Sequence, residues 1–92
     1  MKIVFSDKFG NGLDGILNFI AQDSLNRATE FNDALYEKIL EIPSRSYSFR
    51  KNKPLKREDT RDLIFKGYVI VFRIKPGQIK ILSIYKHNLP NY

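Results

Sequence analysis

Residues 61–85, RDLIFKGYVIVFRIKPGQIKILSIY, predict three consecutive antiparallel β-strands. The stretch is rich in the β-branched and aromatic residues that strands favour. Lys66-Gly67 and Pro76-Gly77 interrupt it, and proline followed by glycine suits a type II turn. The predicted strands are Arg61–Phe65, Tyr68–Lys75 and Gln78–Tyr85.

Pairing Lys75 with Gln78 across the second turn sets the register of the last two strands. Arg73 then lies opposite Lys80, and like charges directly across a strand pair repel. An anion bound between them would relieve that repulsion. We expect the helices to pack on the face that carries Tyr68, Ile70, Phe72, Ile74, Ile79, Ile81, Ser83 and Tyr85. The opposite face would carry Val69, Val71, Arg73, Lys80, Leu82, Ile84 and Lys86.

The N-terminal half predicts one strand and two helices. Residues 2–6 alternate as a short strand does, and apolar residues then recur at helical spacing. Asp23 or Ser24 is a candidate N-cap of the second helix, and Pro43 ends it. The two apolar stripes are Phe9, Leu13, Ile16, Leu17 and Ile20, then Ala28, Phe31, Leu35, Ile39 and Ile42.

Residues 1–92 are therefore expected to form a single α+β domain of order β-α-α-β-β-β. An antiparallel helix hairpin would pack on one face of a C-terminal antiparallel sheet. Residues 44–60 show no clean periodicity, and they predict a surface loop with a short strand near Tyr47–Arg50.

Charge divides unevenly near Pro43. Residues 1–43 carry four Lys/Arg against seven Asp/Glu, whereas residues 44–92 carry twelve against three, which gives the net charge of +6. A domain this small cannot bury nine excess cations, so they must form a basic surface that attracts polyanions. The predicted binding residues are Arg50, Lys51, Lys53, Lys56, Arg57, Lys80 and Lys86.

The composition excludes several kinds of site. The chain has no cysteine and one histidine, His87, so neither a disulfide nor a thiolate metal site is possible. No acidic spacing suggests another metal site, and no apolar run has the length of a signal peptide or a membrane span. We expect a cytoplasmic protein with no metal, no cofactor and no membrane partner.

Three passages together resemble the RelE/ParE superfamily of bacterial toxins. They are SLNRATEFNDALYEKILEIP at residues 24–43, RDLIFKGYVIVFRI at residues 61–74 and QIKILSIYKHNLPNY at residues 78–92. Their order and spacing cover nearly the whole chain. The resemblance implies a toxin of a type II toxin–antitoxin pair, silenced by a cognate, co-encoded antitoxin.

The superfamily has two known activities, and the resemblance leaves both open. ParE-like toxins inhibit DNA gyrase, whereas RelE-like toxins cleave mRNA on the ribosome without a metal. Many RelE-like toxins carry an arginine directly after the "GY" pair, where this chain has Val69, and this favours the ParE-like activity. In a RelE-like mRNA endonuclease, Arg61 and Arg73 would hold the scissile phosphate, with Tyr85 or His87 as acid or base.

A third hypothesis is a non-catalytic module that binds nucleic acid through the same basic face. Whether the chain is an enzyme therefore stays open at this point. If it is a toxin, an acidic or amphipathic antitoxin segment is expected to cover the basic sheet face. Such a segment would add a strand to a free edge or lay a helix across Val69, Val71, Leu82 and Ile84.

Overall fold

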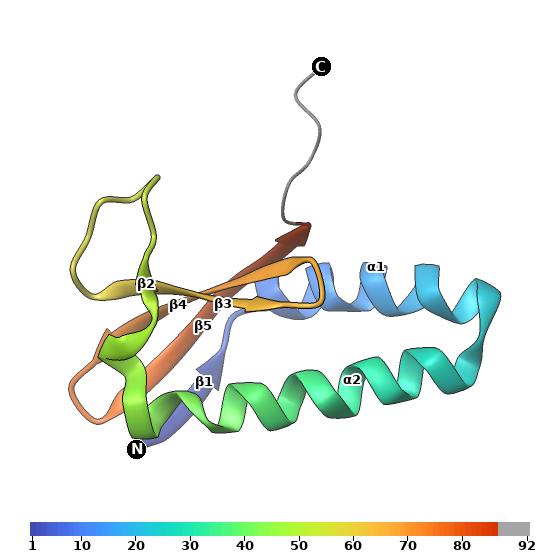
Figure 1. The fold of residues 1–92 in the computed structure, drawn as a ribbon, viewed down its shortest axis with the longest axis horizontal. Helices are drawn as coiled ribbons and strands as arrows, with labels where there is room; N and C mark the ends of the chain where they lie inside the picture. Colours follow the sequence, from blue (N-terminus) through green and yellow to red (C-terminus); the bar gives the residue numbers. More distant parts are fainter. Residues whose placement is uncertain (87–92) are drawn as a thin grey trace.

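A computed structural model describes residues 1–86 of the chain, and it shows a five-stranded sheet with two helices on one face (Figure 1). The strand order is β1-β5-β4-β3-β2, in which β1 is parallel to β5 and every other pair is antiparallel. The predicted α+β class and element order are confirmed. The elements are β1 (Lys2–Phe5), α1 (Asp7–Asp23), α2 (Leu25–Leu40), the 3₁₀ segment η1 (Ile42–Ser48), β2 (Arg50–Lys51), β3 (Thr60–Phe65), β4 (Tyr68–Lys75) and β5 (Gln78–Lys86).

Two serines start the helices. The Ser6 hydroxyl accepts a hydrogen bond from the Phe9 amide at 3.0 Å and caps α1. The Ser24 hydroxyl accepts one from the Arg27 amide at 3.2 Å, so Ser24, one of the two predicted candidates, caps α2. Capping satisfies a backbone N–H group that has no partner inside the helix.

The core lies between the helix hairpin and one face of the sheet. Both predicted apolar stripes point into it, and Leu35, Ile39 and Phe72 are fully buried. The ring of Phe31 packs edge-on against that of Phe65, with the ring centroids 5.5 Å apart. Aromatic pairs of this geometry add to the burial of apolar surface that stabilises the fold.

A β-bulge changes the predicted faces of β5. The expected register holds from Lys75 opposite Gln78 as far as Phe72 opposite Ile81, but Val71 then pairs with Ser83. One extra residue in β5 reverses the alternation of every side chain beyond it. The prediction was therefore wrong for the end of this strand: Ser83 and Tyr85 lie on the face away from the helices, and Ile84 and Lys86 lie on the helix side.

Ser6 and Gly12 hold the bulged strand against α1. The Ser6 hydroxyl donates to the Leu82 carbonyl at 2.6 Å, and its amide donates to the Ile81 carbonyl at 2.9 Å. A Cβ atom at Gly12 would lie 3.2 Å from Cγ2 of Ile84 and 3.3 Å from its carbonyl oxygen. Glycine at this position lets α1 approach β5 closely, which offsets part of its cost to the helix.

The predicted surface segment 44–60 is more ordered than a loop. It begins inside η1, where the Ser44 and Ser48 hydroxyls each donate to a carbonyl three residues earlier. The short strand falls at Arg50–Lys51, later than the predicted Tyr47–Arg50. Hydroxyl groups that compete for backbone carbonyls favour such turns over extended strands.

Candidate functional site

The sheet has one face that the helices do not cover, called the open face below. Because cross-strand partners share a face, the register assigns its residues. Among them Val69 and Val71 are buried, whereas Ile64 and Tyr85 are exposed. The open face carries Lys2, Val4, Arg50, Thr60, Asp62, Ile64, Val69, Val71, Arg73, Lys75, Gln78, Lys80, Ser83 and Tyr85.

Residues 50–59, called the basic loop, comprise β2 and the segment that rises from the sheet between β2 and β3 (Figure 1). The Asn52 amide donates to the Thr60 carbonyl at 3.0 Å and closes the base of this loop. The side-chain amide of Asn52 donates to Asp62 at 2.7 Å, and both residues are buried. These buried hydrogen bonds fix the loop's position relative to the sheet.

Most of the loop's positive charge is matched by nearby acids. Arg50 pairs with Asp62 at 3.2 Å, and Lys51 pairs with Glu58. Glu58, Asp59 and Asp62 are the three acids of residues 44–92, and all of them pair with this loop. Lys53 and Lys56 make no ion pair with any residue from 1 to 86.

Arg57 and Asp59 form a two-bond ion pair, with nitrogen–oxygen distances of 2.8 and 2.7 Å. The Arg57 guanidinium holds the pKa of the Asp59 carboxyl well below its usual range. The Lys51 ammonium lowers the pKa of Glu58 in the same way. Both acids are therefore ionised at neutral pH and cancel loop charge.

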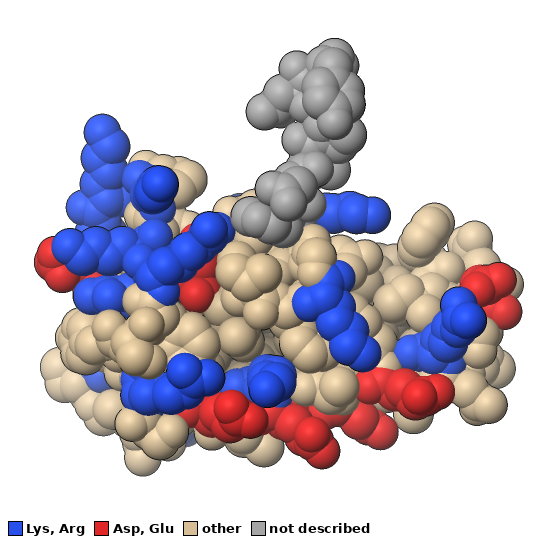
Figure 2. Space-filling model, viewed as in Figure 1, with Lys and Arg blue, Asp and Glu red and all other residues tan. Residues whose placement is uncertain are grey.

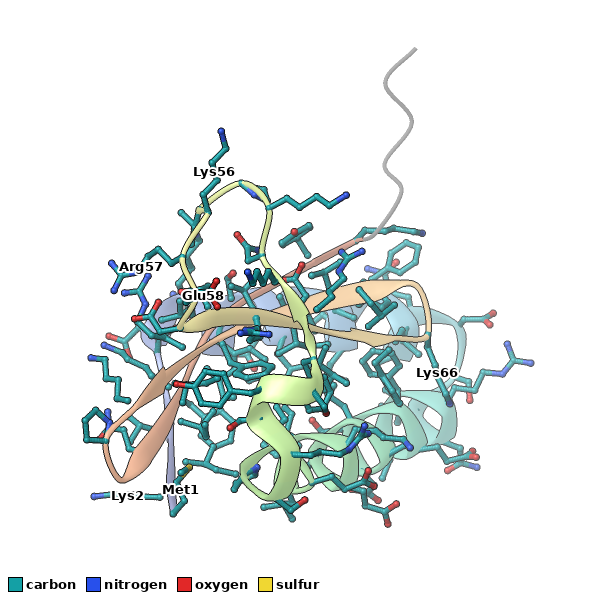
Figure 3. All side chains as sticks on the ribbon, turned by 60° about the vertical axis from the view of Figure 1, so that its left-hand side comes forward. Met1, Lys2, Lys56, Arg57, Glu58 and Lys66 are labelled. Atoms are coloured by element: carbon teal, nitrogen blue, oxygen red, sulfur yellow. The ribbon has the colours of Figure 1, made fainter. Side chains whose placement is uncertain are left out.

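Figure 2 shows how this charge is distributed over one face of the molecule. Basic side chains gather over the basic loop, and acidic side chains follow α2 along the opposite border. In Figure 3 the side chain of Lys56 extends from the tip of the loop, away from the sheet. Lys2 lies beside the start of β1, and Lys66 lies across the molecule from it.

Arg61 lies on the helix side of the sheet, opposite Phe72 in the register. Its side chain is buried, and its guanidinium donates to the carbonyls of Glu58, Tyr47 and Phe49 at 2.9, 3.1 and 3.0 Å. A fourth bond, of 3.4 Å, reaches the Glu58 carboxylate. These contacts tie η1, β2 and the basic loop together.

Arg73 lies on the open face, between Thr60 of β3 and Lys80 of β5. Its Nε donates to the Thr60 hydroxyl at 3.3 Å. The sheet therefore separates Arg73 from Arg61, and the structure does not bring these two predicted phosphate ligands together.

Tyr85 lies at the other end of the open face, opposite Val69. Four residues of strand separate Val69 from Arg73, which is about 13 Å. Tyr85 borders a groove of about 360 Å³ between the basic loop and β5. Lys86 points to the α1 side of β5, and His87 lies outside the described residues. The groove is lined by Lys8, Asn52, Pro54, Leu55, Val71, Leu82, Ser83 and Tyr85.

The apolar strip expected to receive an antitoxin helix is not exposed. Val69 and Val71 are buried on the open face, and Ile84 is buried in the core because of the bulge. Of the four residues, Leu82 is the most accessible, and it is half-buried. The outer strands of the sheet are β1 and β2.

The structure adds two cations that the sequence argument did not select. Lys75 follows Arg73 on the open face, and Lys2 joins them because β1 pairs in parallel with β5. We call Lys2, Arg73, Lys75 and Lys80 the hairpin-end patch, since they surround the end of the β4–β5 hairpin. The predicted hairpin register could have revealed Lys75, but Lys2 required the β1–β5 pairing.

The described part of the chain has neither a cluster of metal ligands nor a helix that could cross a membrane. Residues 1–86 contain no group of three or more His, Cys, Asp or Glu side chains that could hold a metal ion. None of the helices described is long and apolar enough to span a bilayer.

The fold is that of a RelE/ParE-superfamily toxin. The sequence model of the family described as "ParE toxin of type II toxin-antitoxin system, parDE" matches residues 3–88. The chain belongs to this ParE toxin family.

Solved structures agree with this assignment at the level of the fold. A chain of the chromosomal ParDE toxin–antitoxin system from P. aeruginosa superimposes with a TM-score of 0.78 and 19% sequence identity. The match covers 96% of this chain and 97% of that one. No curated protein sequence matches this chain.

Proposed function

We propose that this ParE-family toxin arrests growth by inhibiting DNA gyrase and that a co-encoded antitoxin neutralises it. The observation that carries the choice of target is the placement of Arg61 and Arg73 on opposite faces of the sheet. RNA cleavage needs cations that converge on one pentavalent phosphate. Because Arg61 is committed to backbone carbonyls, Arg73 would have to act without it.

Val69 supports the same choice. It occupies the position where many RelE-like toxins carry an arginine, and here it is fully buried. The backbone positions of Tyr85 and Arg73 are about 13 Å apart along the sheet, so an endonuclease would need both long side chains to extend toward one phosphate. The alternative, a RelE-like mRNA endonuclease, therefore has the weaker support. A non-catalytic nucleic-acid-binding module is the third candidate, and it would cause no growth arrest.

The antitoxin is expected to use a free edge of the sheet. The strand β1 has four residues and lies at one border, whereas β2 at the other border has only two. An added antitoxin strand would pair with the outer backbone groups of β1. Gyrase and ribosomes are both cytoplasmic, so a cytoplasmic location is part of this proposal.

Induced expression with two parallel readouts tests the target. We expect growth arrest, loss of plasmid supercoiling in cells and dose-dependent inhibition of purified gyrase. Co-expression of the neighbouring reading frame should restore growth. Codon-phased mRNA cuts in primer extension, without any change in supercoiling, would contradict the proposal.

One variant separates the two mechanisms. Tyr85→Phe removes a hydroxyl that is a candidate acid or base while keeping the ring. A gyrase inhibitor should retain its growth arrest in this variant. An endonuclease that uses the hydroxyl for proton transfer should lose roughly 10²-fold or more in cleavage rate.

A further inference from the structure

We infer that the hairpin-end patch binds the phosphate backbone of duplex DNA. The inference deepens the proposed function, because gyrase acts on DNA and a toxin that holds that DNA would be retained at its target. Four features of the patch support it: unpaired charge, adjacent like charges, the spacing of the cations and a polar surface.

The charge of the patch is less compensated than the charge of the basic loop. Lys2, Arg73, Lys75 and Lys80 make no ion pair with any residue from 1 to 86, whereas three of the loop's five basic residues do. Arg57 and, to a smaller extent, Arg73 lower the pKa of the Asp59 carboxyl. That carboxylate forms its ion pair with Arg57 and not with Arg73. Of the nine Lys and Arg side chains in residues 1–86 that form no ion pair, four therefore lie at the hairpin end.

The patch also places like charges next to one another. Arg73 is the direct cross-strand partner of Lys80, an arrangement that costs folding free energy. Lys75 lies two residues from Arg73 on the same strand, and Lys2 and Lys75 are both partners of Gln78. A chain under no demand to bind an anion would gain stability from a neutral residue at one of these positions.

The spacing of the four cations suits contact with neighbouring phosphates of DNA. Strands lie about 4.8 Å apart and same-face residues of one strand about 6.6 Å apart, so the patch is about 10 Å across. Each strand of duplex DNA carries one negative charge per about 3.4 Å of the axis, so a footprint of this width spans about three phosphates of one strand. Four cations on a rigid sheet can therefore contact several phosphates at once.

The surface of the patch favours DNA over an acidic protein. Protein interfaces centre on buried apolar or aromatic anchors. The exposed large apolar residues of the open face and the basic loop are Ile64, Tyr85 and Leu55, which lie away from the hairpin end, while Met1, also exposed, lies beside Lys2. The patch itself offers lysines, an arginine and the amide of Gln78, which are typical of backbone-phosphate contacts.

Fluorescence anisotropy with a short labelled DNA duplex and the purified full-length chain tests the inference without gyrase. The patch variant is Lys75→Gln/Lys80→Gln, and the matched control is Lys53→Gln/Lys56→Gln in the basic loop. Both remove two positive charges, of which only Lys80 is half-buried, and thermal melts should show that both variants fold.

The expected result is a difference in salt dependence. Each lost phosphate contact lowers the slope of log K against log salt by about 0.9, so the patch variant should lose about 1.8 of the wild-type slope. Between about 50 and 200 mM salt, the wild type should then lose roughly tenfold more affinity than the patch variant. The loop control should keep the wild-type slope.

Three results would overturn the inference. The first is no wild-type binding to the duplex at low salt. The second is an equal loss of affinity in the patch and loop variants. The third is unchanged duplex binding by the patch variant, together with loss of binding to a polyglutamate peptide or to an RNA duplex of the same sequence. If the chain binds DNA through the patch but leaves gyrase unaffected, the proposed function fails and this inference stands.

Discussion

The basic loop and the hairpin-end patch are both rich in Lys and Arg, but they differ in how much of their charge is available. The loop has five basic residues among positions 50–57, and three of them are paired with Glu58, Asp59 or Asp62. The patch has four cations drawn from β1, β4 and β5, and none of them is paired with a residue from 1 to 86. The density of charge along a sequence therefore does not measure the charge that a partner meets.

The two regions also differ in what their arginines do. Arg61 is buried beneath η1 and supplies hydrogen bonds to three backbone carbonyls, so it belongs to the framework of the basic loop. Arg73 is half-buried on the open face and makes one hydrogen bond to Thr60. Buried donors that satisfy carbonyls stabilise a fold, whereas an accessible guanidinium can serve a ligand.

The largest expected effect comes from exchanging these arginines for methionine, which keeps most of the side-chain bulk. Arg61→Met should lower the free energy of unfolding by about 2 kcal/mol, because three carbonyls lose their donor. In a domain of this size that loss lowers Tm by about 10 °C. Arg73→Met is the matched control and should cost about 0.5 kcal/mol, since it loses a single weak hydrogen bond.

Chemical denaturation followed by circular dichroism measures both values. Equal losses in the two variants would contradict the division into a framework arginine and a ligand arginine. DNA affinity gives the reverse order for the same pair: Arg73→Met should weaken binding, and folded Arg61→Met should not.

The second largest effect is expected from the two acids Glu58 and Asp59, whose ion pairs should keep the basic loop from binding DNA. Glu58→Gln/Asp59→Asn leaves Lys51 and Arg57 without their partners, and the loop should then contact phosphates. The slope of log K against log salt should grow by up to about 2, with affinity for duplex DNA rising severalfold at low salt.

Asp33→Asn/Glu37→Gln on α2 is the control for this change. It alters the net charge by the same amount on α2, away from the basic loop (Figure 2). An equal rise in both double variants would mean that net charge, and not loss of the local pairs, governs binding.

Much of the fold could be predicted from the sequence because local patterns determine it. The β4–β5 turn, the α2 stripe and the Ser24 cap all follow from residues within a few positions of each other. The bulge at Leu82 could not be predicted from local sequence, because its surroundings include Ser6, which is 76 residues away and donates to the Leu82 carbonyl. The bulge places Ile84 in the core and Tyr85 on the open face.

The site was less predictable than the fold, for the same reason. The loop lysines and arginines were selected by density, but their pairing with Asp62 or Glu58 depends on how β2 and β3 align. Arg61 differs from Arg73 in its face of the sheet, which only the β3–β4 register decides. The contribution of Lys2 depends on a parallel pairing between the two ends of the chain.

The smallest expected effect concerns the cost of the patch itself. Lys80→Gln removes the like-charge contact with Arg73, so it should raise the free energy of unfolding by a few tenths of a kcal/mol at low salt. The gain should shrink as salt screens the repulsion. Lys53→Gln removes one exposed charge that forms no ion pair with residues 1–86, and it should leave stability nearly unchanged. Denaturant titrations at two salt concentrations measure both variants. A gain in stability that accompanies weaker DNA binding is the expected signature of a position kept cationic for its ligand, whereas a loss of stability in Lys80→Gln would show that no repulsion is stored there.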